Sequence, residues 1–354
     1  MPRVYGQFLD KASLLKRVGS MEQLAYVRPF VYGEGAAEGV KAFEVSNGTG
    51  LEYTVLESKG MDLIGMRYKG MNLHYAPKSG VVSPALADMN GTEFMRSISG
   101  GMLYTCGLSN VGTACVDEGF DHPFHGRMKT TPAEMLSADC HWEGDEYVLS
   151  LSGQMREAAI FEENLTLRRT LSTSVGSKSV RIRDTLENQG FEERQLMLLY
   201  HINIGFPVLD EGAELILPSR EKLARDEESE RHASRFDELS GPIVGFREHV
   251  YRHRLSAGRS GWTGAAVINR RLGLGVYVKY DPLRLPYLVQ WKSLRAGDYA
   301  TGLMPATCFV NGRSFERENG TLQPIAPLQQ LTYELEIGVL EGEEEFGEFM
   351  DFLS

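Results

Sequence analysis

The sequence predicts an all-β fold built from large stacked antiparallel sheets. Apolar residues alternate with polar ones in several segments, 38 glycines supply turns, and no repeat of 20–50 residues or βαβ rhythm is visible. The clearest apolar stripe consists of Leu331, Tyr333, Leu335, Ile337 and Val339. Because alternate side chains of a strand point to opposite faces, such a stripe indicates a strand with one face in a core.

Further stripes of the same period occur along the chain. They comprise Val180, Ile182 and Leu186, then Leu274, Val276, Val278 and Tyr280, and near the N-terminus Leu51, Tyr53 and Val55. Turn residues bound each of them, as expected of strands joined in a meander. Two layers of antiparallel strands are the usual way to bury so many one-sided strands.

Helices are expected to be few. The sequence predicts a short helix over about residues 7–18 and an amphipathic one over about 341–353, where Phe346, Phe349, Met350 and Leu353 recur at helical spacing. Residues 225–239 carry many charges of both signs and are expected to be a solvated excursion, helical or loose. No Pro/Gly/Ser-rich linker divides the chain, so residues 1–354 are predicted to form a single domain.

The composition and charge disfavour some kinds of binding partner. With 42% hydrophobic and 24% charged residues, the chain is typical of globular proteins, and its formal charge of −11 disfavours nucleic acids and anionic membranes. No apolar run is long enough to span a bilayer, and the N-terminus lacks the apolar core of a signal peptide. The four cysteines form no CxxC pair, which favours reduced thiols and a cytoplasmic location.

The most informative polar pair is His201 and Asn203, set two residues apart in an apolar run that begins at Leu196. In a strand these two side chains project from the same face. Burying them costs free energy unless they find hydrogen bonds. The pair therefore indicates a structural network or the floor of a site for a polar ligand, and we favour the second interpretation.

Other segments carry candidate functional groups. His125 and Arg127 follow His122 in a loop containing proline and glycine, although solvated histidines on a surface loop would show the same pattern. Trp291 could stack on a sugar face beside Lys292, or it could be a core tryptophan beside a paired lysine. Arg96 precedes the glycine-rich stretch 100–110, whose glycines permit close backbone approach, and is a further candidate for binding substrate.

Four stretches occur together in a characteristic order between about residues 60 and 340. They are Gly100 to Gly107 (GGMLYTCG), His125-Gly126-Arg127, Leu199 to Pro207 (LYHINIGFP), and Leu285-Pro286-Tyr287 with Gln290-Trp291-Lys292. In this order the chain resembles the aldose 1-epimerase (galactose mutarotase-like) superfamily, in particular a poorly characterised bacterial branch of it. The resemblance implies a β-supersandwich with a carbohydrate cleft across one sheet.

The resemblance also implies a reaction that needs no cofactor. Members of the superfamily interconvert sugar anomers through the open-chain aldehyde, with a general acid at the ring oxygen and a general base at the anomeric hydroxyl. His201 matches the family's acid histidine, which lies in a similar His-x-Asn segment. His125 matches an earlier histidine that binds or polarises the sugar.

One position departs from the family's pattern. Met304 stands where a glutamate commonly serves as the base, and a thioether cannot accept that proton at neutral pH. Glu248 is the first substitute candidate for the base, followed by Asp281 and Glu316. Met304 is then expected only to line the substrate site, together with Arg127, Asn203, Trp291, Lys292 and Arg96.

Three functions remain open from the sequence. The first is an aldose mutarotase, the second a carbohydrate-binding protein without turnover, and the third another sugar-processing enzyme such as a lyase, a 2-epimerase or a metal-assisted hydrolase. Arg127 and Lys292 suggest a sugar with an anionic substituent. No metal site is predicted, because His122, His125 and His201 show only a weak ligand spacing. The oligomeric state is open.

Overall fold

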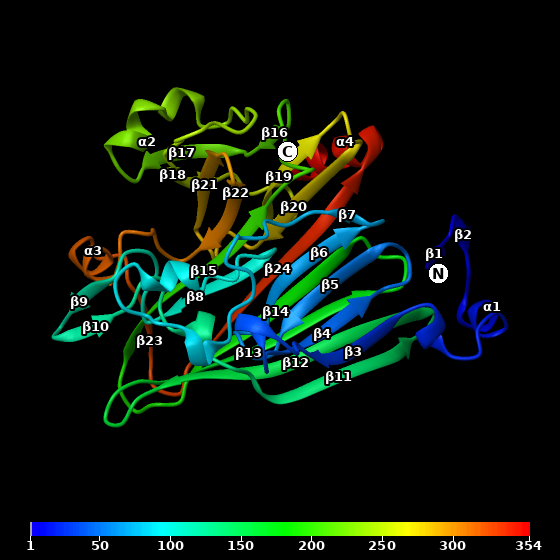
Figure 1. The fold of residues 1–354 in the computed structure, drawn as a ribbon, viewed down its shortest axis with the longest axis horizontal. Coiled ribbons are helices and arrows are strands. Elements are labelled where there is room, and N and C mark those ends of the chain that lie inside the picture. The colour runs from blue at the N-terminus through cyan, green and yellow to red at the C-terminus, as the bar shows by residue number, and fades with distance from the viewer. Residues whose placement is uncertain (1) are drawn as a thin grey trace.

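The computed structural model describes residues 2–354, and it is dominated by antiparallel sheets (Figure 1). The largest sheet has eight strands and holds the long C-terminal strand near its middle. Its strands in spatial order are β11 (Glu134–Glu143), β12 (Glu146–Ala158), β13 (Asn164–Ser174), β14 (Ser179–Asn188), β24 (Gln330–Glu341), β20 (Leu274–Tyr280), β19 (Thr263–Asn269) and β16 (Glu214–Ile216).

A second large sheet carries the histidine strand predicted above. Its order is β17 (Ser219–Ala224), β18 (His249–Leu255), β21 (Tyr287–Arg295), β22 (Asp298–Ala306), β15 (Arg194–Ile204) and β23 (Gln323–Ile325). A further strand of this sheet, β8 (Leu103–Leu108), pairs with β15 along six positions, including His201 opposite Tyr104. The histidine strand is therefore central, with neighbours on both sides.

The remaining strands form smaller sheets. A five-stranded sheet comprises β3 (Tyr26–Val31), β4 (Lys41–Ser46), β5 (Leu51–Leu56), β6 (Asp62–Tyr68) and β7 (Met71–Asn72). Two hairpins comprise β1 (Arg3–Val4) with β2 (Gln7–Phe8), and β9 (Cys115–Asp117) with β10 (Phe120–His122). In Figure 1 the five-stranded sheet overlies the eight-stranded one, and the shared hydrophobic cluster that includes Leu63 and Leu167 joins the two.

The predicted stripes become core-facing strands. Tyr333, Leu335, Ile337 and Val339 of β24 are each at most 2% exposed, whereas the intervening Glu334 lies in water. β20 is buried on both faces, because its second face lies under the C-terminal helix at Tyr277. The prediction of an all-β fold with large antiparallel sheets is confirmed.

The helices are short, as expected, but one differs from its predicted bounds. They are α1 (Lys11–Leu15), α2 (Glu227–Arg231), α3 (Arg313–Glu318) and α4 (Gly342–Leu353). Residues 7–18 do not form one helix, because Gly6 with a φ of +82° allows Gln7–Phe8 to turn back on Arg3–Val4. The helix then begins only after Asp10, whose side chain accepts a hydrogen bond from the Ser13 amide.

Six 3-10 turns complete the secondary structure: Met21–Gln23, Gly35–Ala37, Pro84–Leu86, Glu93–Arg96, Met128–Thr130 and Ala233–Arg235. The charged segment 225–239 contains α2 and the last of these turns, and it lies over β17 and β18 rather than away from the fold (Figure 1). Among residues 2–354, no helix has the length and apolar character needed to cross a membrane.

Candidate functional site

The site is built on one of the two faces of strand β15. Its even-numbered residues, such as Leu198 and Ile202, belong to the main core, whereas Met197 and Leu199 belong to a second cluster on the other face. His201 and Asn203 continue that second face, as period-2 geometry requires. Because both faces are buried, the polar pair lies in a largely apolar surrounding.

A loop brings His125 to the same place. His125 has a φ of +57°, and Gly126 follows with its backbone against Gly107 so closely that a Cβ would lie 2.2 Å from the Gly107 oxygen. The amide of Gly112 donates a hydrogen bond of 3.1 Å to His125 Nδ1. In the neutral ring this acceptor role places the proton on Nε2. The His125 and His201 rings lie 5.7 Å apart, nearly perpendicular.

Trp291 and Glu248 form another part of the wall. The Trp291 ring lies 5.6 Å from the His201 ring, and its Nε1–H donates a hydrogen bond of 2.8 Å to Glu248 Oε2. Arg225 holds the other oxygen of Glu248 through a hydrogen bond of 2.8 Å from Nη1. The carboxylate is thus oriented by two donors, one of them charged, and it keeps lone pairs on both oxygens for a further donor.

These groups converge on one cavity of about 220 Å³. Its walls are Tyr75, Met95, Ile98, Gly100, Tyr104, Gly112, Thr113, Phe124, His125, His201, Asn203, Arg225, Glu248, Val250, Trp291, Met304 and Val310. The volume is below the roughly 300–1,000 Å³ typical of sites for drug-sized ligands. Mostly apolar walls with a few convergent polar groups are typical of small-molecule sites.

Three polar atoms in the walls have no hydrogen-bond partner within residues 2–354. They are the Tyr104 hydroxyl, His201 Nδ1 and Asn203 Oδ1, and all three are buried. The Asn203 amide nitrogen is used, because it donates to the carbonyl oxygens of Gly101 and His201. Unpaired buried polar atoms cost free energy, so such a cluster indicates groups that are satisfied by water or a ligand.

The two imidazoles are neutral at physiological pH. Burial lowers the pKa of His201 to about 4, although the Asn203 side chain and the charge of Glu248 act in the opposite direction. Burial and the neighbouring His201 hold the pKa of His125 well below its usual range. Desolvation of the charged form is the main cause in both cases.

Three predicted substrate-binding residues lie outside this cavity. Arg127 lines a separate hollow, where its guanidinium contacts Ser109 and the Asp121 carbonyl. Lys292 is buried on the other face of β21 from Trp291, and its ammonium donates to the carbonyl oxygens of Arg235 and Glu238. Arg96 is largely exposed and pairs with Glu93.

The other polar candidates have structural environments. Glu316 is fully buried and accepts hydrogen bonds from the Phe309 amide and the Thr321 hydroxyl, and Asp281 accepts one from the Leu283 amide. His122 lines the same separate hollow as Arg127, so the three histidines considered as metal ligands do not meet. Met304 lines the 220 Å³ cavity together with His201 and is 2% exposed.

Several wall residues were not predicted, among them Tyr104 and Arg225. Tyr104 belongs to the glycine-rich stretch 100–110 that was singled out only for its backbone, and its position opposite His201 is set by the register of β8 on β15. Arg225 belongs to the segment interpreted as solvated. Its charge pattern contains no signal that it would pair with a glutamate 23 residues away.

The fold is shared with solved structures whose names refer to aldose 1-epimerases or galactose mutarotases. A Klebsiella pneumoniae protein provisionally named an aldose 1-epimerase superposes with a TM-score of 0.89 at 23% identity, over 94% of this chain and 91% of that one. A galactose mutarotase-like protein from Clostridium acetobutylicum gives 0.64 at 13% identity, over 90% and 99%. Galactose 1-epimerase from Lactobacillus acidophilus gives 0.59 at 12% identity, over 90% and 100%.

At these identities the likeness shows the fold, which is the galactose mutarotase-like β-supersandwich. No curated protein matches the sequence. The model of one protein family matches residues 37–339, which is most of the chain. The chain therefore belongs to the family described as a domain of unknown function, DUF4432.

Proposed function

We propose that this chain works as one carbohydrate-binding domain that holds a monosaccharide in the 220 Å³ cavity and interconverts its anomers. The observation that carries the proposal is the convergence of two imidazoles, an indole and an oriented carboxylate on one small cavity, with buried polar atoms that lack partners among the described residues. The fold shared with sugar epimerases supports it.

The binding part of the proposal follows from the wall groups. Trp291 offers an apolar face to the C–H side of a pyranose ring, and Glu248 accepts hydrogen bonds from hydroxyls. The Nε2–H of His125 is the donor that its tautomer leaves free. Arg225 is neutralised by Glu248 and Asp226, and Arg127 and Lys292 lie elsewhere. The ligand is therefore proposed to be a neutral sugar rather than the anionic one first expected.

Anomer exchange requires two proton transfers. Glu248 accepts the proton of the anomeric hydroxyl while His201 donates one to the ring oxygen, the C1–O5 bond breaks and an aldehyde forms. Rotation about C1–C2 and the reverse transfers close the other anomer. Since the pKa of His201 is about 4, only a small fraction of the enzyme carries the acid form at pH 7. The exchange rate is therefore expected to rise, by up to about tenfold per pH unit, as the pH falls from 7 toward 5.

The test is the rate of anomer exchange, measured by NMR exchange spectroscopy with a panel of hexoses and pentoses. Wild-type protein should accelerate exchange for at least one sugar, and His201→Asn should lower the catalysed rate by about 100-fold or more. His141→Asn is the matched control, because His141 is an exposed histidine bound to Asp139 and Glu143 on strand β11. If the protein accelerates anomer exchange of no sugar in the panel, the catalytic part of the proposal is wrong.

A second function is favoured by Met304, the buried methionine in the cavity wall where the superfamily pattern has its catalytic base. In that case the protein binds a sugar without turnover. Saturable binding by calorimetry together with an exchange rate equal to that of the buffer would establish this alternative.

A further inference from the structure

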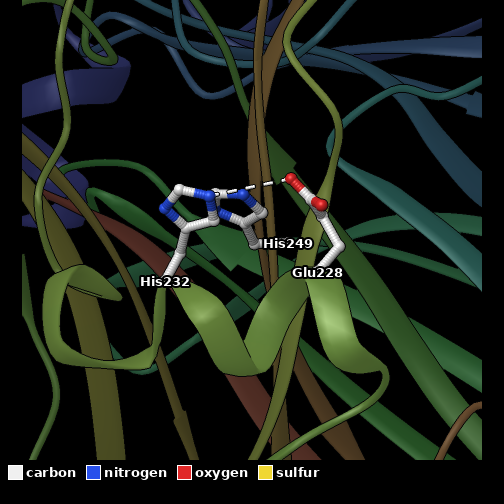
Figure 2. Close-up of side chains that lie close together, drawn as sticks. All are labelled: Glu228, His232 and His249. Atoms are coloured by element: carbon white, nitrogen blue, oxygen red, sulfur yellow. Dashed lines mark ion pairs between the residues drawn. The ribbon is translucent and has the colours of Figure 1, made fainter.

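Glu228 in the first turn of α2, His232 at the C-terminal cap of that helix and His249 at the start of β18 lie close together (Figure 2). Each offers one ligand atom, and these atoms all lie within 4.8 Å of one another. Glu228 and His232 are four residues apart and therefore share one side of the helical turn. Among residues 2–354 this is the group of three such side chains that could hold a metal ion.

The chemistry of this donor set suits a transition metal. Two imidazoles and one carboxylate, with further coordination positions open, are typical of zinc and iron(II) sites. His249 is 4% exposed, and within the described chain its Nδ1 is buried without a hydrogen-bond partner. Glu228 Oε1 lies 3.6 Å from His232 Nε2, too far for a strong hydrogen bond. The group is thus assembled without being satisfied by its own contacts.

The neighbouring cations Arg231 and Lys292 do not occupy the ligand atoms of this group. Arg231 approaches only the other oxygen of Glu228, at 3.4 Å and on an exposed surface. Lys292 lies opposite His249 in the sheet, but its ammonium donates to the carbonyl oxygens of Arg235 and Glu238. The group faces a cavity of about 450 Å³ that Glu228, His232 and His249 line together, so solvent or a ligand could complete the coordination.

One adjustment is needed for binding. The His232 and His249 rings are stacked, with centroids 4.4 Å apart and planes 17° from parallel, and a metal ion binds in the plane of each ring. Zn–N distances of about 2.0–2.1 Å bring tetrahedral ligand atoms closer together than 4.8 Å. His232 follows the last residue of α2 and its side chain is 46% exposed, so its rotation displaces no core side chain.

We propose that Glu228, His232 and His249 form a binding site for one divalent transition-metal ion of the zinc class. The ion would tie α2 to β18, and α2 begins two residues after Arg225, which orients Glu248. Glu228 also lines a hollow that it shares with Glu248 and Trp291, two residues of the cavity proposed to bind a sugar. The proposal does not depend on sugar binding.

The test is Zn²⁺ binding to the full-length protein after treatment with a chelator, by calorimetry and by the absorption of bound Co²⁺. Wild-type protein should bind one ion, and Co²⁺ should give the intense visible bands of a four- or five-coordinate site. His232→Ala and Glu228→Gln should each weaken Zn²⁺ binding by at least about 100-fold, more than the loss of an outer partner of a ligand costs.

His141→Ala serves as the matched control, because this exposed histidine also lies between two carboxylates but outside the group. It should leave the affinity unchanged, as should His201→Asn in the sugar cavity. Thermal unfolding of each variant shows that it is folded. No stoichiometric binding to the wild type, or equal binding to His232→Ala, would overturn the proposal.

Discussion

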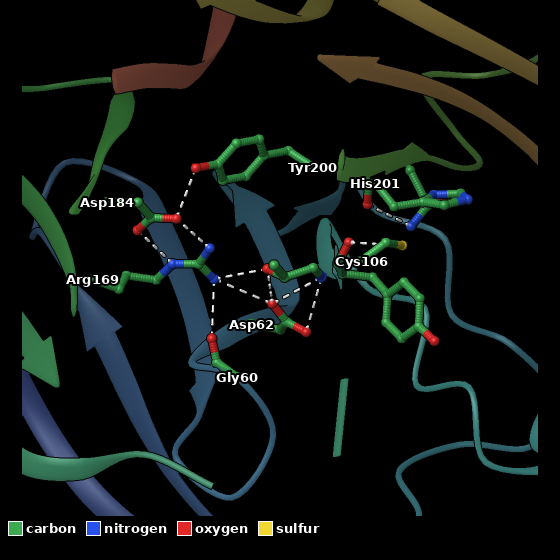
Figure 3. A network of polar contacts seen from close by, with 10 residues as sticks. Gly60, Asp62, Cys106, Arg169, Asp184, Tyr200 and His201 are labelled. Atoms are coloured by element: carbon green, nitrogen blue, oxygen red, sulfur yellow. Dashed lines mark hydrogen bonds and ion pairs between the residues drawn. The ribbon is translucent and has the colours of Figure 1, made fainter. Parts of the chain in front are cut away.

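The two faces of one pair of strands differ in how their polar side chains are hydrogen-bonded. On β8 and β15, Thr105 and Tyr200 point into the main core, whereas Tyr104 and His201 point into the sugar-sized cavity. Figure 3 shows both sides, with the core network on one side of the strands and His201 on the other. The two sets of residues alternate along the same strands, so the same backbone carries both.

On the core face every partner is supplied. Arg169 is fully buried and donates to both oxygens of Asp184, at 2.9 and 2.7 Å, and to the Thr105 hydroxyl at 2.9 Å. The Tyr200 hydroxyl donates to Asp184 at 2.8 Å, and Thr105 donates to Asp62 at 2.6 Å. A fully connected network of this kind holds one geometry of the two strands.

On the cavity face, by contrast, the Tyr104 hydroxyl, His201 Nδ1 and Asn203 Oδ1 have no partner within residues 2–354. On one face of these strands the polar side chains hydrogen-bond to one another. On the other face, polar atoms of Tyr104, His201 and Asn203 have no partner among the described residues. A fully hydrogen-bonded network is typical of structure, whereas unpartnered atoms on residues that line a cavity are candidates for hydrogen bonds to water or a ligand.

The largest effect is expected from breaking the core network. Arg169→Met leaves the carboxylates of Asp62 and Asp184 buried without their cation, and the expected loss is about 3–5 kcal/mol of unfolding free energy. Urea unfolding measures it. Arg168→Met, the exposed neighbour on β13, is the control and should change stability little. A loss below 1 kcal/mol for Arg169→Met would contradict the structural role.

Acid is expected to lower the free energy of unfolding, because buried histidines are protonated more readily in the unfolded chain. Burial lowers the pKa of His201 and of His253 to about 4, so both are neutral in the folded protein and become protonated on unfolding below about pH 6.5. Above pH 6.5 the two histidines do not reduce the free energy of unfolding. As the pH falls from 6.5 toward 4, each lowers it by an amount on the order of 3 kcal/mol.

Urea unfolding at pH 7, 6 and 5 follows this loss. His201→Asn removes one such group and should reduce the loss of stability in acid. His141→Asn should not reduce it, because carboxylate contacts raise the pKa of that exposed histidine and its protonation therefore favours the folded state. Equal pH dependence in wild type and His201→Asn would show that His201 does not titrate below its usual pKa.

A pair of tyrosines compares the two faces directly. Tyr200→Phe removes a hydroxyl that is bonded to Asp184, with an expected cost of about 1.5–3 kcal/mol. Tyr104→Phe removes a hydroxyl that has no partner among the described residues, so stability should change by less than about 0.5 kcal/mol. Thermal and urea unfolding of both variants test this, and equal costs would erase the distinction between the faces.

Much of the fold could be predicted because apolar and polar residues alternate along many of its strands. The stripe of β24 and the pair His201 and Asn203 follow from period 2 alone, and both lie where that period places them. The same rule explains why Lys292 does not line the cavity, although it was predicted to. As the neighbour of Trp291 in a strand it points to the opposite face, so the two could not both line the cavity.

The remaining errors concern segments without a regular period. Arg127 lies two residues after His125, but the positive φ values of His125 and Gly126 turn the backbone, and the arginine lines a different hollow. Arg225 and Glu248 come together through the packing of α2 and β17 on β18, which no local pattern encodes. The group proposed to bind a metal comes together through the same packing, and no local sequence pattern indicates it.

Calorimetric titration of the wild-type protein with a panel of neutral monosaccharides tests the central claim most directly, namely that the free polar groups of the cavity face bind a sugar. The account predicts saturable binding of one molecule of at least one sugar per chain, weakened several-fold by Tyr104→Phe and unaffected by His141→Asn. No heat of binding with any sugar, or equal affinity in Tyr104→Phe, would contradict it.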